Sequence, residues 1–488
     1  MSNESWRPKL HVAPHDGSIS DPNGLCQFKG TYHFFCQNAP TYPPDVDSPH
    51  GWGHFASRDL VNWTFLGCHI MPDFPGDRDG AYSGGAYINE DTDEAWFYYT
   101  GNVRDGEGDG TYSGRDANQT LMKSYNGINM GQKQVVLDNS SYPAYCSNHV
   151  RDPKVWKQDG VLHMLLGART RADSRGAIMM YDSPDGIDWT MSGSVTNFGE
   201  KPFGYMWECP DRIVLDGREF ISTCPQGMAT AIESQGSTRT TAQNVHGAGY
   251  FPIDGTIVDL MAQDTELMDA EAPHAAIDES TYVDWDYGFD FYACQSLVDD
   301  KGRTLLVGWM SLPHDEADVR AYDNPTQTWR GCLTIPRVLT YCEKCGRILQ
   351  APPAEIDTLR GEAQAFDGSA TLPKPSDVVI EGIEGKGTIR FGEFLELRFE
   401  DDVAKLEFSD MSKSGDRKLR QAPIDEVRNV RILVDTSVLE IFVNDGMYVF
   451  GTRFYEESDE LVISHDLKAS SQTWYPMGEV TVNYLVTR

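Results

Sequence analysis

The sequence predicts an all-β protein in which a five-bladed β-propeller is followed by a C-terminal β-sandwich. Two internal repeats and a change in the sequence pattern near residue 340 support this prediction. Repeats tens of residues long are typical of propellers, because each blade is a four-stranded sheet built from a similar stretch of chain. On the repeats alone, a sandwich or tandem β domains are the alternatives.

The first repeat consists of five short runs rich in β-branched and aromatic residues, each preceded by a polar turn. Their starting positions are 64, 66, 57 and 85 residues apart. Runs of this composition after a turn are typical of buried strands in antiparallel sheets. The runs are Thr31–Gln37, Ala95–Gly101, Val161–Gly167, Arg218–Cys224 and Arg303–Trp309. A second repeat comprises SRDLVNW at 57–63, SYNGINM at 124–130 and SPDGIDW at 183–189.

The sequence pattern changes after about residue 340. Residues 346–361 (GRILQAPPAEIDTLRG) have the prolines of a connector and a short helical turn. From residue 362 onward, apolar and polar residues alternate in segments at hairpin spacing, which is typical of a β-sandwich. The predicted division is therefore a propeller over residues 1–340, a connector over 341–361 and a sandwich over 362–488.

The charge balance limits the partners of the protein. There are 41 Lys and Arg residues against 74 Asp and Glu residues, a net charge of −33. A chain this acidic repels polyphosphate, which argues against nucleic acid and anionic membranes as partners. The composition favours a neutral or cationic ligand, although a local basic pocket could override the overall field.

Apolar runs and cysteines suggest the compartment. No run approaches the roughly 18 apolar residues of a membrane span, and the first residues, MSNESWRPKL, lack the pattern of a signal peptide. The ten cysteines have no framework spacing, so we expect free thiols and a cytoplasmic location. Cys342 and Cys345 form one CxxC pair, but no second pair at matching spacing predicts zinc.

Three acids occur beside Pro or Cys in otherwise apolar segments. They are Asp21 in SDPNG, Asp152 in RDPK and Glu208 in WECPD. A proline after an acid pushes that acid toward extended backbone and fixes the direction of its carboxylate. Any one of them could be a capping, turn or salt-bridge residue. Three in equivalent contexts of successive repeats predict carboxylates that converge at the centre of a propeller.

Converging carboxylates suit the hydrolysis of a glycosidic bond. One carboxylate can act as nucleophile and another as acid/base across a sugar. Trp52, Trp207 and Trp309 could stack on the C–H face of a sugar, while Gln37 could bond to its hydroxyls. The predicted partner is therefore a small sugar.

These segments, with several others, resemble glycoside hydrolase family 32, which includes invertases, inulinases and sucrose-6-phosphate hydrolases. The matching segments run nearly end to end in family order. They are SDPNG (20–24), YHFFCQNAP (32–40), GWGHFASRDLVNW (51–63), YSGGA (82–86), RDPKVW (151–156), YMWECPD (205–211), PQGM (225–228), DYGFDFYACQ (286–295), LLVGWM (305–310), WRGCLTIPR (329–337) and VRILVDTSVLEIFVNDG (430–446).

The resemblance implies roles for individual residues. Asp21 matches the nucleophile, Glu208 the general acid/base, and Asp152 the acid that holds fructosyl hydroxyls and stabilises the transition state. The positions that match the lining of the fructose subsite are Gln37, Trp52, Ser83 and Arg151. The family cleaves with retention through a fructosyl-enzyme intermediate, and this chemistry requires no cofactor or metal.

One departure from the family concerns the substrate. Members usually have Gly-Trp-Met-Asn before the nucleophile, where this chain has Gly17-Ser18-Ile19-Ser20. The reaction type is unaffected, because all three acids are present, but the preferred substrate could differ. We therefore expect a β-fructofuranosidase acting on sucrose and short fructo-oligosaccharides. The alternatives are an exo-inulinase or levanase, a sucrose-6-phosphate hydrolase, and an inactive fructan-binding protein.

Overall fold

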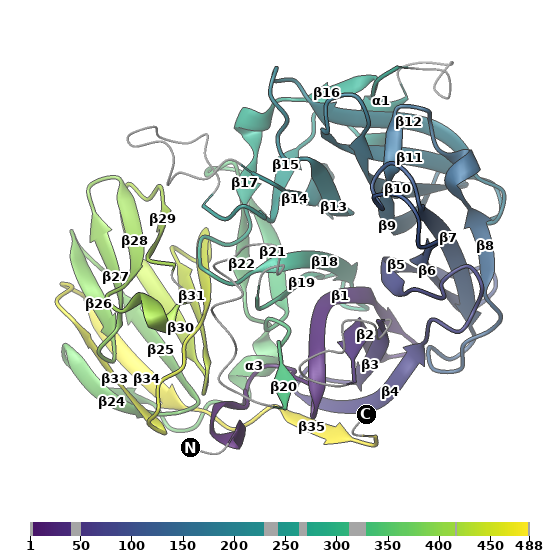
Figure 1. Ribbon diagram of the computed structural model, residues 1–488. Coiled ribbons are helices and arrows are strands. Elements are labelled where there is room, and N and C mark those ends of the chain that lie inside the picture. Colours follow the sequence, from purple (N-terminus) through teal and green to yellow (C-terminus); the bar gives the residue numbers. More distant parts are fainter. Residues whose placement is uncertain are drawn as a thin grey trace.

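A computed structural model describes residues 3–40, 50–228, 243–262, 271–311, 328–414 and 417–486. Its strands form seven sheets within these ranges. Figure 1 shows five sheets around a common centre and two six-stranded sheets to one side, in green and yellow. The prediction of an all-β protein is confirmed.

The first sheet joins distant parts of the chain. Two short strands pair in parallel with its edges: one follows the last predicted repeat and the other lies at residues 481–484. The strand order is β20 (Trp329–Arg330), β1 (Gly17–Phe28), β2 (Thr31–Ala39), β3 (Gly51–Ser57), β4 (Asn62–Ile70) and β35 (Thr481–Tyr484).

The next four sheets follow one another along the chain. The second contains β5 (Ala81–Asn89), β6 (Glu94–Arg104), β7 (Arg115–Ser124) and β8 (Gln134–Leu137). The third contains β9 (Cys146–Gln158), β10 (Val161–Thr170), β11 (Gly176–Ser183), β12 (Thr190–Asn197) and β16 (Ala275–Ile277). The fourth contains β13 (Met206–Leu215), β14 (Arg218–Gln226), β15 (Gly249–Pro252) and β17 (Val283–Asp284). The fifth contains β18 (Tyr292–Val298), β19 (Thr304–Trp309), β21 (Arg337–Cys342) and β22 (Arg347–Ala351).

Both sequence repeats correspond to recurring structure. The five predicted runs are the second strands of the five sheets, namely β2, β6, β10, β14 and β19. The second repeat forms the turn between the third and fourth strands of the first three sheets. In each turn a side-chain oxygen of Asp59, Asn126 or Asp185 accepts two backbone N–H groups, which explains the recurring Asp or Asn.

The remaining two sheets pack face to face around an apolar core that includes Ile380, Leu397, Leu406 and Ile441. One contains β23 (Gln364–Ala365), β34 (Ser471–Pro476), β25 (Ser376–Glu381), β30 (Asn429–Val434), β31 (Val438–Val443) and β32 (Tyr448–Arg453). The other contains β24 (Ser369–Pro373), β33 (Glu460–His465), β26 (Gly387–Phe391), β27 (Leu395–Glu400), β28 (Val403–Phe408) and β29 (Leu419–Ala422).

The described helices are short. They are α1 (Ile257–Met261), α3 (Ala354–Asp357) and the 3-10 turns η1 (Asn3–Trp6), η2 (Asn139–Ser141), η5 (Glu279–Thr281) and η6 (Met411–Lys413). Among the residues described, none of these helices has the length and apolar character to span a membrane. The expected boundary at residue 340 falls inside β21, and β22 continues the fifth sheet to Ala351.

The expectation that all ten cysteines are free is wrong for one pair. Cys342 and Cys345 are joined by a disulfide across the turn between β21 and β22. The turn brings the two Cα atoms to 5.3 Å, within the usual range for a disulfide. The other eight cysteines are free.

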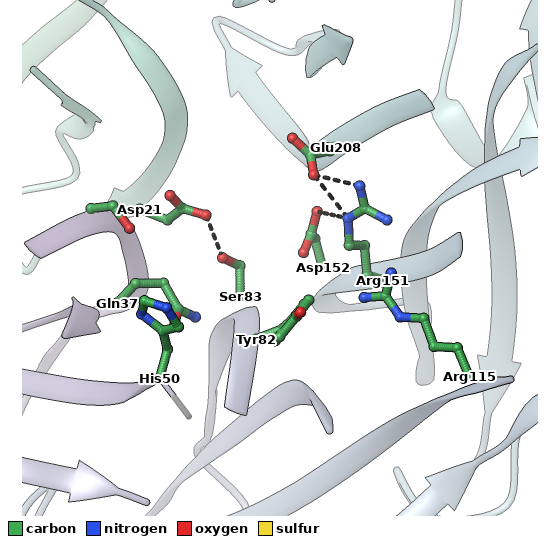
Figure 2. A pocket seen from close by; sticks show the side chains of 10 residues that line it. Asp21, Gln37, His50, Tyr82, Ser83, Arg115, Arg151, Asp152 and Glu208 are labelled. Atoms are coloured by element: carbon green, nitrogen blue, oxygen red, sulfur yellow. Dashed lines mark hydrogen bonds and ion pairs between the residues drawn. The ribbon is translucent and has the colours of Figure 1, made fainter. Parts of the chain in front are cut away.

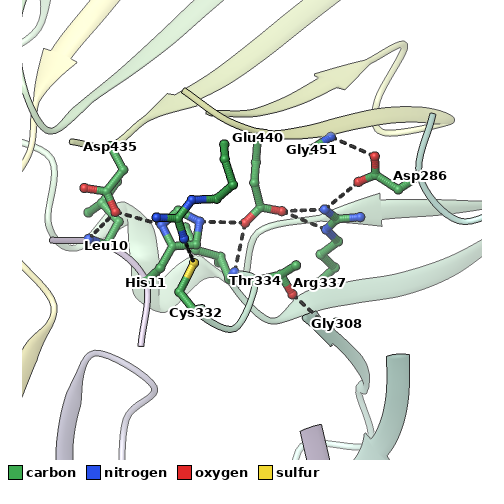
Figure 3. Close-up of polar contacts among 12 residues, drawn as sticks. Leu10, His11, Asp286, Gly308, Cys332, Thr334, Arg337, Asp435, Glu440 and Gly451 are labelled. Carbon is green, nitrogen blue, oxygen red and sulfur yellow. Dashed lines mark hydrogen bonds and ion pairs between the residues drawn. The ribbon is translucent and has the colours of Figure 1, made fainter. Parts of the chain in front are cut away.

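A buried charged network joins the five sheets that surround the common centre to the two sheets that pack face to face (Figure 3). Oε2 of Glu440 accepts hydrogen bonds from Nε and Nη2 of Arg337, at 2.9 and 2.6 Å, and Nη2 also donates to Asp286 at 2.8 Å. The other carboxylate oxygen of Glu440 lies 3.0 Å from His11, whose second ring nitrogen lies 2.7 Å from Asp435. Asp435 and Glu440, the two acids of the VDTSVLEIF segment, therefore hold the five sheets and the two packed sheets together.

The network keeps its groups charged despite burial. Burial alone lowers the pKa of His11, but hydrogen bonds to Asp435 and Glu440, and the charges of both, raise it to about 9. Burial alone raises the pKa of Glu440, but Arg337, His11 and a backbone N–H lower it to about 2. At neutral pH the buried positive and negative groups therefore compensate one another.

We expect Glu440→Gln to lower the free energy of unfolding by about 3–5 kcal/mol, because it leaves Arg337 and His11 buried with less compensation. Urea denaturation at pH 7 measures this. Glu384→Gln is the matched control: Glu384 pairs with Lys468 on the surface, where the side chains are 69% and 78% exposed, so the free energy should hardly change. Equal effects of the two substitutions would contradict a stabilising role for the network.

Candidate active site

A cavity of about 260 Å³ lies where the inner strands of the sheets meet, and all three predicted acids line it (Figure 2). Three of the five predicted binding residues, Gln37, Ser83 and Arg151, line it as well. The full lining is Ser20, Asp21, Gln37, His50, Tyr82, Ser83, Arg115, Arg151, Asp152 and Glu208. The acids come from the first, third and fourth sheets, so the expectation of successive repeats is wrong, while their convergence is confirmed.

The inner strands are β1, β5, β9, β13 and β18, which are the first strands of the five sheets in chain order. A β-bulge in each of them places these side chains. In every one of the five sheets, two residues of the first strand oppose a single residue of the second at this point. The bulged pairs are Ser20-Asp21, Tyr82-Ser83, Asp152-Pro153, Cys209-Pro210 and Ala293-Cys294. A bulge bends its strand and redirects the neighbouring side chains. The prolines fit because a bulged residue makes no ladder bond, so the missing N–H costs nothing there.

Asp21 lies on one side of the cavity. Its Oδ2 accepts a hydrogen bond of 2.8 Å from the hydroxyl of Ser83, which belongs to the second sheet. Burial raises the pKa of Asp21, and the negative charge of Glu208 raises it further, whereas the Ser83 bond opposes the rise. The two carboxylates are therefore close enough to interact electrostatically.

Glu208 lies across the cavity and is held by two neighbouring sheets (Figure 2). Nε and Nη2 of Arg151 donate to its Oε1 at 2.9 and 2.6 Å. The hydroxyl of Tyr292, on β18, donates to its Oε2 at 2.6 Å. Burial and the charge of Glu208 hold the pKa of Tyr292 well above its usual value, so the phenol stays protonated and can donate.

Asp152 is the most buried of the three acids, with an exposed fraction of 4%. Its Oδ2 accepts the backbone N–H of Cys209 at 2.9 Å and lies 3.9 Å from Nε of Arg151. Burial raises the pKa of Asp152 to about 7; the charges of Glu208 and Asp21 add to the rise, while Arg151 and the Cys209 N–H oppose it. Its backbone has a φ of 65°, a left-handed conformation that Asp tolerates better than most residues.

The other two predicted binding residues do not line the cavity formed by the described residues. Trp52 is 0% exposed and donates from its indole to the backbone oxygen of Tyr82 at 3.0 Å. Trp309 is 6% exposed and packs in an apolar cluster with Tyr292. Trp207 is also fully buried. These indoles are buried because they pack between sheets, so they support the bulged strands rather than offer a stacking surface.

Three lining residues were missed by the motifs. Tyr82 stands in the YSGGA segment, directly before Ser83, so the segment itself could have indicated it. His50 precedes the conspicuous GWGHF segment, and Arg115 stands in no motif. Arg115 reaches the cavity because β7 pairs with β6, a long-range feature that the local sequence does not show.

Asp21 lies on one side of a polar cavity and Glu208 on the other, with Asp152 beside Glu208 (Figure 2). Such a site can attack a bond with one carboxylate while the other transfers a proton to the departing atom. Within the described ranges, no group of three or more His, Cys, Asp or Glu side chains could hold a metal ion.

Comparisons with known proteins agree with the resemblance found in the motifs. The glycosyl hydrolases family 32 N-terminal domain matches residues 11–352, and the C-terminal domain of that family matches residues 398–475. A sucrose-6-phosphate hydrolase of Bacillus subtilis (strain 168) is 30% identical over 472 residues, covering 93% of this chain and 90% of that protein. A raffinose invertase of Escherichia coli is 30% identical over 487 residues, covering 94% and 92%. The solved sucrose-6-phosphate hydrolase of Lactobacillus gasseri has a TM-score of 0.78 at 25% identity, covering 98% and 94%.

The raised pKa of Asp152 predicts how the stability of the folded protein depends on pH. Asp152 ionises near its ordinary value of 3.8 in the unfolded chain and at about 7 in the folded protein. Between these values the unfolded chain has lost a proton that the folded protein keeps, so the stability falls as the pH rises, and the full cost is present above pH 7. Below the lower value the two states bind the same number of protons and the cost disappears.

We therefore expect Asp152→Asn to raise the melting temperature by several degrees at pH 8, with the gain vanishing near pH 4. Asparagine keeps an oxygen for the Cys209 N–H and removes the buried charge. Differential scanning calorimetry across this pH range measures it. Asp216→Asn is a matched control, since Asp216 also has a positive φ, of 50°, but lies in an exposed turn. A lower melting temperature for Asp152→Asn at pH 8 would contradict the account.

Proposed function

The chain belongs to glycosyl hydrolase family 32, and we propose that it is a β-fructofuranosidase that releases fructose from sucrose and short fructo-oligosaccharides with retention of configuration. The observation that carries the proposal is the convergence of Asp21, Asp152 and Glu208 on one cavity. The names of the relatives, a sucrose-6-phosphate hydrolase and a raffinose invertase, support a substrate with a fructosyl unit.

In the first step, an oxygen of Asp21 attacks the anomeric carbon of the fructosyl unit and the bond to the leaving sugar breaks. Glu208 gives its proton to the departing oxygen, so the leaving sugar departs as a neutral alcohol. The Ser83 hydroxyl fixes the rotamer of Asp21 for this attack. The oxygens of Glu208 contact Arg151 and Tyr292, and in this step the protonated acid donates to the glycosidic oxygen in place of one of these contacts.

In the second step, water attacks the anomeric carbon and Glu208 takes one of its protons. The bond to Asp21 breaks, and fructose and the free carboxylate are released. Asp152 binds fructosyl hydroxyls and places negative charge near the oxocarbenium-like transition state. Arg151 positions both acids, because its guanidinium bonds to Glu208 and lies beside Asp152.

The architecture forms part of the proposal. The five sheets formed by residues 17–351, the first of them extended by β35, are the blades of a five-bladed β-propeller, and the two sheets that pack face to face are a β-sandwich. The propeller then ends after Ala351 and the connector covers residues 352–361, since β22 completes the fifth sheet. The eight free cysteines favour a cytoplasmic location, whereas the Cys342–Cys345 disulfide is of a kind that is rare in that compartment.

Two substitutions test the assigned roles. Asp21→Ala and Glu208→Ala should each lower kcat on sucrose by several orders of magnitude, because each removes a step that the other acid cannot perform. Azide should restore turnover of Glu208→Ala on a fructoside with a good leaving group, because only the base of the second step is then missing. Glu90→Ala, which changes an exposed acid in the turn between β5 and β6, should leave kcat unchanged.

The substrate panel consists of sucrose, sucrose 6-phosphate, kestose, inulin and levan, with fructose release as the readout. Preferred turnover of inulin or levan would favour an exo-acting fructanase. Binding of fructosides without any release of fructose would favour an inactive fructan-binding protein. Near-normal turnover of sucrose by Asp21→Ala or Glu208→Ala would overturn the proposed mechanism.

A further inference from the structure

The turn between β21 and β22 carries a disulfide that the proposed hydrolysis does not use. Cys342 and Cys345 enclose only Glu343 and Lys344 in the sequence. The two strands that meet here are the third and fourth of the fifth sheet, and no residue of the turn lines the central cavity. The CxxC motif therefore needs an explanation of its own.

This disulfide is accessible in the folded protein. Cys345 is exposed, as are Glu343, Lys344 and Gly346 around it, whereas Cys342 is half-buried. Exchange between a thiol and a disulfide begins when a thiolate reaches one of the two sulfurs, so the rate depends on access. A thiolate can approach Cys345 without any unfolding of the hairpin.

The other eight cysteines contrast with this pair. Seven of them are buried and Cys68 is half-buried. Burial raises the pKa of the thiols of Cys26, Cys68 and Cys332 to about 12. Because the thiolate is the reactive form, such thiols are inert at neutral pH. Accessible sulfur chemistry in this chain is thus concentrated at one turn.

The backbone closes this turn without help from the disulfide. The N–H groups of Cys345 and Gly346 both donate to the carbonyl oxygen of Cys342, at 3.1 and 2.9 Å. Strands β21 and β22 pair residue by residue up to Cys342, which lies opposite Arg347. Gly346 adopts the left-handed conformation that the turn requires, with a φ of 63°. These contacts keep the two cysteines adjacent after the sulfur–sulfur bond breaks, so the bond can form again.

The two sulfurs of the pair differ in environment. The N–H of Cys345 also donates to Sγ of Cys342 at 3.3 Å, a contact that stabilises negative charge on that sulfur. Lys344 in the turn and Arg347 opposite Cys342 bring two positive charges, against the single negative charge of Glu343. The exposed sulfur of Cys345 is therefore the one that is attacked, and Cys342 is the better leaving group.

A permanent disulfide would not suit the rest of the chain. Eight free cysteines are the pattern of a reducing compartment, where the disulfides that do occur are usually transient and take part in redox chemistry. Exposed disulfides are also among those that thiols reduce most readily. A pair that alternates between disulfide and dithiol is consistent with both the free cysteines and the bond between Cys342 and Cys345.

We propose that Cys342 and Cys345 form a reversible thiol–disulfide exchange site whose partner is a dithiol reductant. The proposal is independent of the hydrolase activity, because it concerns a turn that contributes nothing to the cavity. The site is formed by the exposed sulfur of Cys345, the Cys342 sulfur that accepts the backbone N–H, and a turn that holds both in place.

Reduction proceeds in two exchange steps. A thiolate of the dithiol attacks Sγ of Cys345, the Cys342–Cys345 bond breaks, and its electron pair leaves on Sγ of Cys342, which then takes a proton. The second thiolate of the reductant attacks its own sulfur in the mixed disulfide and releases Cys345, which is protonated in turn. The protein gains two electrons and two protons, and the dithiol loses the same number and becomes a cyclic disulfide.

Oxidation by glutathione disulfide is the reverse process. Cys345 as thiolate forms a mixed disulfide and releases one glutathione thiolate. Cys342 as thiolate then attacks Cys345 and releases the second. The protein loses two electrons and two protons, and two molecules of glutathione thiol are formed.

A CxxC pair has two other common roles, a metal site and a structural crosslink. Structural zinc has four protein ligands, but the described residues contain no group of three or more His, Cys, Asp or Glu that could hold a metal ion. A crosslink stabilises most when it closes a long loop, whereas this one spans a short turn that backbone hydrogen bonds already close. Both roles also predict results different from those of reversible exchange.

The test determines the redox state of each cysteine in the folded full-length chain. Wild type is treated with millimolar dithiothreitol at neutral pH, and iodoacetamide then labels accessible thiols before denaturation and peptide mass spectrometry. We expect two labels, on Cys342 and Cys345, and none on the other eight cysteines. A sample that is reoxidised with glutathione disulfide before labelling should take up neither label.

Single-cysteine variants test the order of attack. Cys342→Ser leaves the exposed Cys345, and Cys345→Ser leaves the half-buried Cys342. We expect Cys342→Ser to form a mixed disulfide with glutathione disulfide about tenfold faster, because its thiol is accessible. The matched control is Cys68→Ser, which removes the other half-buried cysteine and should behave as wild type. Equal rates for the two turn variants, or the reverse order, would overturn the assignment of Cys345 as the attacked sulfur.

The labelling results separate the three roles. Two labels that reoxidation abolishes support the exchange site. No label before denaturation would show a structural crosslink, and labels on the buried cysteines would show that reduction unfolds the chain; either result overturns the proposal. Zinc bound by the reduced chain, with protection of both thiols from iodoacetamide, would identify a metal site and also overturn it. The readout is the mass of labelled peptides, so failure of the proposed hydrolase function would leave it unaffected.

Discussion

The β-bulges of the five inner strands determine where every reactive side chain lies. In an unbroken strand, side chains alternate between two faces, so a shift of one residue would turn Asp152 into the space between sheets. The bulge absorbs one extra residue and directs the side chain toward the centre instead. Because the same irregularity occurs at the same place in all five sheets, residues far apart in sequence meet in one cavity. The Ser83 bond to Asp21 and the Tyr292 bond to Glu208 both depend on this coincidence.

Electrostatics opposes the assembly of such a site, and other interactions must offset that cost. Three carboxylates share the cavity, and the pKa of Asp152 rises to about 7 through burial and its acidic neighbours. Arg151 offsets part of the repulsion through Glu208. Away from the cavity, Arg337 and Glu440 form a well-compensated buried pair, and an apolar cluster containing Leu10, Ile335 and Phe442 spans both parts of the protein. The stability of the joined parts therefore supports a cavity that is itself strained by charge.

Local patterns predicted much of this structure, and contacts between distant segments account for the rest. The repeated runs identified the second strand of each sheet because burial between sheets selects the same composition each time. The acid-proline pairs identified Asp21 and Asp152: Pro153 stands in a bulged position, which suits proline, and Pro22 directly follows one. Arg115 and Tyr292 were not found, since only strand pairing and the neighbouring sheet bring them to the site. Trp52 was expected to line the cavity, but a large apolar ring gains more from packing beneath it. The Cys342–Cys345 disulfide also depended on the geometry of a turn that composition does not show.

The central claim is that Asp21 forms a covalent bond to the fructosyl unit during turnover. Rapid acid quenching of the enzyme during turnover of sucrose or sucrose 6-phosphate, followed by peptide mass spectrometry, tests it directly. The account predicts one added fructosyl unit on the peptide that contains Asp21, absent from Asp21→Ala and absent without substrate. A fructosyl adduct on a different residue, or sustained turnover by Asp21→Ala, would contradict the account.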